Sequence, residues 1–106
     1  DRSKDIIISG GENISSIEIE KTIMSIKSVK DCAVVGIKDL KWGETPCAFV
    51  ESDDVKLDKK EIINFCRKNL AGFKIPKKVV FTKLPRTSTG KVQKFFLRNM
   101  VKKFNE

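Results

Sequence analysis

Two short stretches in the middle of the chain, only seven residues apart, constrain the fold most strongly. Residues 31–38 (DCAVVGIK) and 46–52 (PCAFVES) are apolar and rich in residue types that favour β-strands. The connection between them, residues 39–45, contains Gly43 and is short. We therefore expect the two stretches to pair as an antiparallel β-hairpin.

Hydrophobic periodicity assigns the segments that flank this hairpin. Ser15 with Glu18, and Asp58 with Glu61, have the spacing of a side-chain cap at the start of a helix. Gly72 is well placed to end the second of these helices. The expected flanking elements, as strands or helices, are a strand at 4–9, a helix at 15–28, a helix at 58–72, a strand at 78–82 and a helix at 93–104.

The order of the expected elements, βαββαβα, predicts an α+β fold. In such a fold about three helices cover a small sheet that contains the central hairpin. The 106 residues suffice for one compact domain that buries roughly 60 to 65% of its unfolded surface. Because the chain begins at Asp1 rather than at a methionine, we expect it to be a piece of a longer protein.

Composition excludes several classes of function. The chain has no histidine, which removes histidine-dependent nucleophiles and most zinc sites, and we expect no metal site. Cys32, Cys47 and Cys66 are odd in number and lack CxxC spacing, so we expect reduced core residues. No apolar run exceeds four residues, which predicts a soluble domain without a membrane segment. We expect an intracellular location, in the cytoplasm or in an organelle matrix such as the peroxisome.

The net charge of +8 predicts an anionic partner, such as nucleic acid, nucleotide phosphates, coenzyme A or an acidic protein. Lys91, Lys94, Arg98 and Lys102 recur at intervals of three, four and four, which places them on one face of the last helix. This basic stripe supports one alternative, a module that binds nucleic acid or another polyanion. The other interpretation is a solvated helix face, which we favour because no nucleic-acid-binding signature accompanies the stripe and most phenylalanines are expected in the core.

The segment PRTSTGK, residues 85–91, is the clearest chemical motif. Pro85 fixes the entry of the chain, and Gly90 permits a sharp turn that exposes the side chain of Lys91. The segment is not a phosphate-binding P-loop, because Pro85 stands where that motif needs glycine and Val92 follows the lysine instead of serine or threonine. Taken alone, the motif predicts a glycine turn that presents the Lys91 ammonium to a ligand. The alternative is a solvated turn in which Lys91 is an ordinary surface lysine without a chemical role.

Four stretches of the chain, in order, resemble the C-terminal domain of the adenylate-forming superfamily, the acyl-CoA synthetases and their relatives. The stretches are 1–20 (DRSKDIIISGGENISSIEIE), 42–50 (WGETPCAFV), 71–81 (AGFKIPKKVVF) and 84–98 (LPRTSTGKVQKFFLR). The segments SGGENIS and QKFFLR are most similar to acyl-CoA ligases for fatty or other aliphatic acids, including plant-type acyl-activating enzymes.

This resemblance implies that residues 1–106 form the mobile C-terminal lid domain of an ATP-dependent, AMP-forming acyl-CoA ligase. The partner would be the protein's own large N-terminal domain, outside this chain, which would bind the carboxylate substrate and most of the ATP, Mg²⁺ and coenzyme A. The small domain would swing between two half-reactions. The isolated domain is therefore expected to be inactive, and no nucleic acid is expected as a partner.

The same resemblance implies roles for individual residues. Lys91 would enter the active site during adenylation, Lys4 would be the hinge between domains, and Arg2 would contact the nucleotide. Apart from the resemblance, the basic stripe on the last helix makes Arg98 a candidate for binding the 3′-phosphate of coenzyme A. After the domain has turned, one loop would face the active site and line the passage for the pantetheine arm of coenzyme A. This loop consists of Ser9, Gly10, Gly11 and Glu12.

Other positions in the matching stretches receive no chemical role from the sequence. Ile8 stands where some relatives carry lysine, and Asn13 where some carry glutamine or arginine, so the family's roles are not transferred to them. Trp42 is interpreted as part of a hairpin turn and its packing. Neither Glu20 nor Lys74 is assigned to catalysis.

Overall fold

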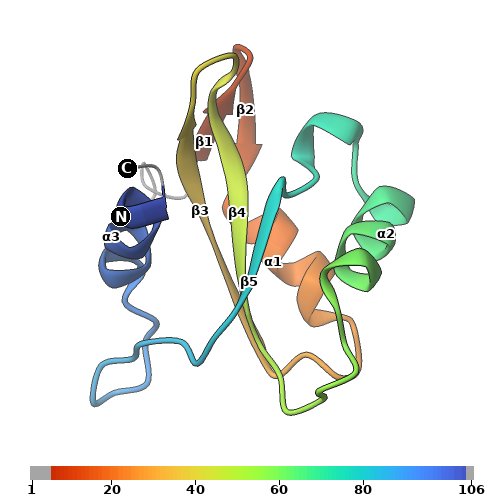
Figure 1. The fold of residues 1–106 in the computed structure, drawn as a ribbon, viewed down its shortest axis with the longest axis vertical. Helices are drawn as coiled ribbons and strands as arrows, with labels where there is room; N and C mark the ends of the chain where they lie inside the picture. Colours follow the sequence, from red (N-terminus) through yellow and green to blue (C-terminus); the bar gives the residue numbers. More distant parts are fainter. Residues whose placement is uncertain (1–5, 105–106) are drawn as a thin grey trace.

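In the computed structural model, which describes residues 6–104 and the side chains of residues 6–101, a five-stranded sheet separates the helices into two layers (Figure 1). Helices α1 and α2 cover one face, and α3 covers the other. The elements, in chain order, are β1 (Ile6–Ser9), β2 (Glu12–Ser15), α1 (Ser16–Met24), β3 (Asp31–Asp39), β4 (Gly43–Glu51), α2 (Lys59–Asn69), the short 3-10 helix η2 (Gly72–Lys74), β5 (Lys78–Phe81) and α3 (Lys94–Phe104).

Strand β4 lies at the centre of the sheet and pairs with three other strands. It runs antiparallel to β3 over nine residue pairs, from Asp31 opposite Glu51 to Asp39 opposite Gly43. It also pairs in parallel with β5 and, at one position, with β1. The expected antiparallel hairpin is therefore confirmed, and with it the α+β class with three α-helices in the described chain.

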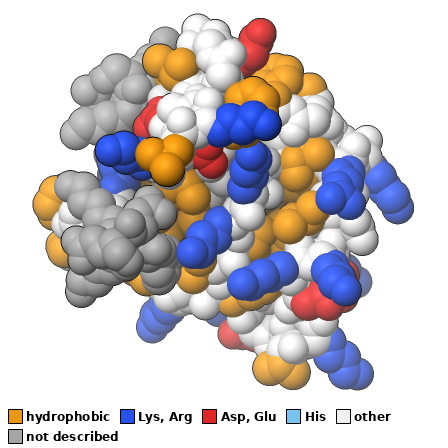
Figure 2. All heavy atoms as spheres, turned by 45° about the horizontal axis from the view of Figure 1, so that its top comes forward, with side chains coloured by type: hydrophobic (Ala, Val, Ile, Leu, Met, Phe, Trp, Pro, Cys, Tyr) orange, Lys and Arg blue, Asp and Glu red, His pale blue; other side chains and the backbone are white. Residues whose placement is uncertain are grey.

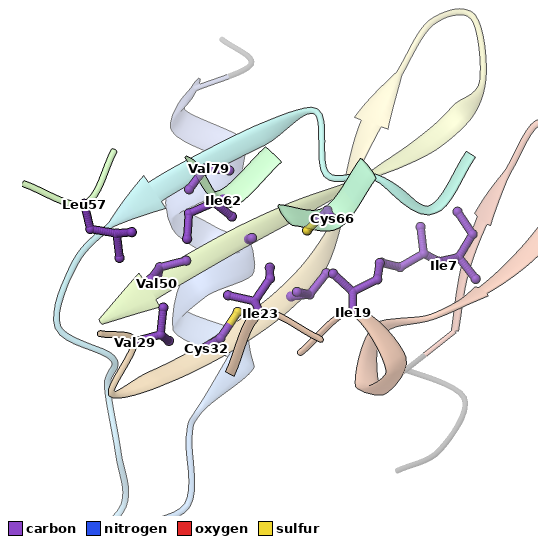
Figure 3. Close-up of a cluster of buried hydrophobic side chains, with 13 residues drawn as sticks. Ile7, Ile19, Ile23, Val29, Cys32, Val50, Leu57, Ile62, Cys66 and Val79 are labelled. Atoms are coloured by element: carbon purple, nitrogen blue, oxygen red, sulfur yellow. The ribbon is translucent and has the colours of Figure 1, made fainter. Parts of the chain in front are cut away.

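Alternate residues of β3 and β4 point to opposite faces, and both faces are buried. Cys32 and Val34 pack with α1 and α2 in the larger cluster of buried side chains, which is drawn in Figure 3. Ala33 and Val35 point the other way, towards the smaller cluster that α3 covers. Burial on both faces explains why these stretches read as continuous apolar runs.

The sequence prediction missed strand β2. Gly10 and Gly11 have φ angles of 56° and 81°, and this pair of positive values suits a two-residue hairpin turn. The turn places Ser9 opposite Glu12, so residues 12–15 pair with β1. The segment ENIS has little strand propensity of its own, and its pairing with β1 makes it a strand. The observed order is thus ββαββαβα, one strand more than expected.

Two helices end earlier than the sequence predicted. Helix α1 ends at Met24 instead of near Ser28, and α2 ends at Asn69. Leu70 then takes an extended conformation, and Gly72 begins η2 instead of closing α2. Tertiary packing decides these boundaries, which local signals place only approximately.

The expectation that most phenylalanines lie in the core was wrong. Phe49 is fully buried, but Phe95 and Phe96 on α3 are 65% and 49% exposed, and Phe73 is 45% exposed. Helix α3 turns only one side to the sheet, where Leu97 is buried, so neighbouring positions face solvent. Exposed aromatic side chains are therefore available at two places on the surface.

The three cysteines are free and buried, as expected for core residues. Burial raises the pKa of the Cys47 and Cys66 thiols to about 11 and raises that of Cys32 as well. These thiols are therefore protonated at neutral pH, and a buried, protonated thiol is unreactive.

An ion pair at the free edge of β3 joins the two helical layers. Glu20 of α1 accepts a hydrogen bond from the backbone N–H of Val34 (2.8 Å) and pairs with the Lys94 ammonium of α3 (2.7 Å). Lys94 also donates to Ser16 Oγ (3.2 Å). The Glu20 and Lys94 side chains are only 16% and 18% exposed. Lys94 therefore does not belong to a solvated basic stripe, which corrects that interpretation of the sequence.

Replacing Lys94 by methionine should destabilise the domain, because Glu20 would stay at the edge of the sheet without its cation. We expect Lys94→Met to lower the free energy of unfolding by about 1 to 3 kcal/mol, since the pair is partly exposed and weaker than a fully buried one. The matched control is Lys91→Met, a change at an exposed lysine three residues earlier, with an expected effect within about 0.5 kcal/mol. Urea unfolding of both variants measures this difference, and equal stabilities would contradict the role of the ion pair.

Candidate functional site

The segment that contains Lys91 forms a closed hairpin loop. Arg86 and Val92 form an antiparallel bridge at its base, and Thr87 donates its backbone N–H to the Lys91 carbonyl (2.8 Å). Gly90, with a φ of 92°, makes the turn and donates its N–H to the Thr87 carbonyl (2.9 Å). Lys91 is exposed beside this turn. The predicted exposed lysine on a glycine turn is confirmed, although a defined loop conformation alone does not give it a chemical role.

The turn between β1 and β2 packs tightly against Trp42. The N–H of Gly10 donates to the Trp42 carbonyl (2.8 Å), and the N–H of Ile8 donates to the Glu44 carboxylate (3.1 Å). A Cβ atom at Gly10 would lie 2.7 Å from the Trp42 ring, whereas one at Gly11 would meet nothing within 4 Å. Gly10 is therefore required both for its backbone angle and for the close approach of the indole.

A cavity of about 350 Å³ opens beside this turn. Ser9, Gly10 and Glu12 of the predicted loop line it, together with Trp42, Phe73 and Lys77. The Lys77 ammonium lies 5.3 Å from the centre of the Trp42 ring, and that of Lys41 lies 5.0 Å away. Aromatic walls beside two cations suit a ligand that carries both an apolar or planar part and negative charge.

Sequence reasoning missed two residues of this cavity. Trp42 was interpreted only as packing, yet it is 40% exposed and forms a wall of the cavity. Phe73 received no role from the sequence, and η2 turns it outward, where it is 45% exposed. The exposed positions of these side chains depend on contacts between segments about thirty residues apart, so no local pattern marks them.

The cavity and the Lys91 loop lie at opposite ends of the molecule. In Figure 1 the β1–β2 turn is at the top, and the loop before α3 is at the bottom left. Arg98 lies on α3, half-buried, and is not among the residues that line the cavity. Lys4 and Arg2 lie outside the described residues. The structure thus brings together the members of the predicted loop, but it does not bring them near Lys91.

Basic side chains outnumber acidic ones on the face of the molecule that includes the β1–β2 turn. Figure 2, which turns the end with the β1–β2 turn towards the viewer, shows Lys and Arg side chains spread among hydrophobic ones, with fewer acidic side chains. The predicted stripe on α3 is interrupted, because Lys94 is paired with Glu20. The four basic residues therefore do not form a continuous solvated stripe on α3.

Two further kinds of site are absent from the part of the chain that the structure describes. No helix there is long and apolar enough to cross a membrane. Within the same residues, no group of three or more acidic or cysteine side chains is placed to hold a metal ion.

Comparison with known proteins identifies the family. The model of the AMP-binding enzyme C-terminal domain matches residues 18–91, which include most of the sheet and end on Lys91. The chain belongs to this family. The resemblance found in the sequence is therefore confirmed.

Its relatives include CoA ligases and acyl-CoA synthetases. "Probable CoA ligase CCL11" of Humulus lupulus is 55% identical over 96% of this chain and 19% of its own length. "Trans-cinnamate:CoA ligase, peroxisomal" of Petunia hybrida is 54% identical over 98% of this chain and 19% of its own. The structure of Mycobacterium tuberculosis fatty acyl CoA synthetase matches with a TM-score of 0.92 and 43% identity, over 98% of this chain and 21% of that one. The chain thus spans about a fifth of the length of these proteins.

The two glycines of the turn should differ in their tolerance of alanine. An alanine at either position would have to adopt a positive φ, which costs about 1 to 2 kcal/mol. Only the alanine at position 10 would also collide with the Trp42 ring. We expect Gly10→Ala to destabilise the domain by about 1 to 3 kcal/mol more than Gly11→Ala, measured by urea unfolding. Equal losses would show that Trp42 does not pack against the turn in solution.

Proposed function

We propose that this chain is the mobile C-terminal domain of an AMP-forming acyl-CoA ligase, which converts a carboxylate and ATP to acyl-AMP and then to a coenzyme A thioester. The observation that carries the proposal is the family match over residues 18–91, joined to relatives named as CoA ligases that align with nearly the whole chain. In this proposal the missing larger domain binds the acid, ATP and Mg²⁺ and contributes to the coenzyme A site. The isolated chain would be inactive.

Lys91 is proposed to act in the first half-reaction. Formation of acyl-AMP brings a carboxylate oxygen to the α-phosphate of ATP, and these two anions repel each other. An ammonium group held between them in a site closed to water lowers that barrier, typically by about a hundred- to thousand-fold in rate for one such donor. The exposed position of Lys91 on a closed loop supports this role, because the side chain is free to enter a site on another domain.

The cavity beside Gly10 is proposed to serve the second half-reaction. Coenzyme A combines an uncharged pantetheine arm, which contains two amides and a terminal thiol, with an adenine ring and three phosphate groups. The loop of Ser9, Gly10, Gly11 and Glu12 would line the path of that arm, and the aromatic and basic walls match the chemistry of the ligand.

The separation of the two sites supports a domain that turns between half-reactions. Lys91 and the Gly10 turn lie at opposite ends, so both can reach one active site only if the domain reorients (Figure 1). Lys4 as hinge and Arg2 as nucleotide contact remain parts of this proposal. The Petunia hybrida relative is named as peroxisomal, and the peroxisome is one of the compartments that we propose.

The proposal predicts that Lys91→Ala in the full-length enzyme separates the half-reactions. Acid-dependent exchange between ATP and pyrophosphate should fall at least about a hundredfold, because the bridging charge is lost. Thioester formation from supplied acyl-AMP should be spared. Lys60→Ala, at an exposed lysine on α2, is the matched control and should leave both steps unchanged. Equal loss of both half-reactions in Lys91→Ala would refute the assignment.

The KM for coenzyme A should show whether Arg98 or the cavity binds the charged end of this ligand. If Arg98 binds the 3′-phosphate, Arg98→Ala raises the KM for coenzyme A alone, whereas Lys77→Ala has that effect if the cavity binds the charged end of the ligand. In whichever variant loses a charged contact with coenzyme A, we expect the KM for coenzyme A to increase several-fold. Steady-state kinetics with each variant measures it, and an unchanged KM in Arg98→Ala removes that residue from the site.

A further inference from the structure

Arg86, at the base of the Lys91 loop, lies between two carboxylates at one end of the sheet. Its guanidinium pairs with Asp31 at the start of β3 (Nη2 to Oδ2, 2.5 Å) and with Glu51 at the end of β4 (Nη1 to Oε1, 3.0 Å). The same Glu51 oxygen accepts the N–H of Leu84, just before the loop (3.0 Å). Three hydrogen bonds thus tie the start of the loop to the end of the central hairpin.

The two carboxylates would repel each other without the arginine. Asp31 and Glu51 are direct partners in the antiparallel register, a position where like charges are unfavourable. The N–H of Leu84 and the Arg86 guanidinium lower the pKa of the Glu51 carboxyl, while Asp31 and Glu51 raise the pKa of Arg86. With side chains 29%, 24% and 15% exposed, Arg86, Asp31 and Glu51 are partly shielded from water.

The anchored residue is also the one that closes the loop. The backbone of Arg86 forms the bridge with Val92, so it holds both arms of the loop at their base. Its neighbour Thr87 accepts the N–H of Lys91 through its hydroxyl (3.2 Å) and donates its own N–H to the Lys91 carbonyl. An unbroken path of bonds therefore runs from the sheet through Arg86 and Thr87 to the backbone of Lys91.

We propose that Arg86, held by Asp31 and Glu51, is the positioning residue for Lys91: it fixes the direction in which the loop leaves the sheet. This inference rests on the proposed role of Lys91 in forming acyl-AMP. Displacement of a catalytic group by about 1 Å can cost about a hundredfold in rate. A planar arginine satisfies both carboxylates at once, which a lysine, as a point charge, cannot do in the same geometry.

The test uses the full-length enzyme and measures the two half-reactions separately. Arg86→Gln should lower kcat for acyl-AMP formation about 10- to 100-fold, with the KM values for ATP and acid and the thioester step from supplied acyl-AMP each changed less than about twofold. The kcat of Arg86→Lys for acyl-AMP formation should lie between those of wild type and Arg86→Gln. This variant also keeps the test possible if Arg86→Gln does not fold. The control is Asp53→Asn, which removes the exposed Lys30–Asp53 pair (3.3 Å) at the same end of the sheet and should leave adenylation unchanged.

A second comparison tests whether Arg86 acts through its anchors. The double variant Asp31→Asn with Glu51→Gln should reproduce the loss in adenylation, and adding Arg86→Gln to it should cost less than about threefold more. Full adenylation in the double variant with a large loss in Arg86→Gln would overturn the inference. Equal loss of both half-reactions in Arg86→Gln would also overturn it. Failure of the underlying function is recognised separately, because Lys91→Ala would then not impair adenylation.

Discussion

The antiparallel pairing of β3 with β4 is the constraint on which the rest of the structure depends. Its nine residue pairs bury side chains on both faces, so the strands of one hairpin contribute residues to both hydrophobic clusters. At about 3.3 Å per residue, the ends of the paired stretch lie roughly 26 Å apart. At one end, Asp31 and Glu51 hold the base of the Lys91 loop. At the other, the turn that carries Trp42 meets Gly10. The hairpin thus sets the distance between the two candidate sites.

A second constraint comes from the free edge of this hairpin. Among the described strands, β3 pairs only with β4, and an open strand edge with unpaired N–H groups invites association with other strands. The Glu20 carboxylate accepts a hydrogen bond from one of these N–H groups, that of Val34, and Lys94 neutralises the carboxylate. The same contact joins a helix on one face of the sheet to a helix on the other. Protection of the edge and connection of the layers are therefore achieved by one ion pair.

These two constraints give the proposed chemistry a rigid support. A lysine that must reach into another domain needs an exposed tip, while its base must be fixed to the sheet. The loop meets both needs, since Lys91 is exposed and the base is bound through Arg86. The cavity at the other end has the same design, with a glycine turn held against the indole of Trp42. The two candidate sites are thus held by contacts with opposite ends of the β3–β4 hairpin.

The sequence by itself determined the features that depend on neighbouring residues. The apolar runs of the hairpin, the caps at Ser15 and Asp58 and the glycine turn before Lys91 are encoded locally and agree with the structure. The α+β class follows from their order. Lys91 and the Gly10 loop were also predicted from the sequence, but their chemical roles came from family resemblance, because no local pattern distinguishes a catalytic lysine from a surface one.

Only the tertiary structure decided what depends on residues far apart in the chain. Strand β2 exists because the turn at Gly10 and Gly11 brings a weak segment against β1. Lys94 is paired because Glu20 reaches it across the edge of the sheet, although its spacing suggested a solvated face. The link from Arg86 to Asp31 and Glu51 spans 55 and 35 residues. The energies of such contacts are set by burial and register, which exist only after the strands and helices have packed.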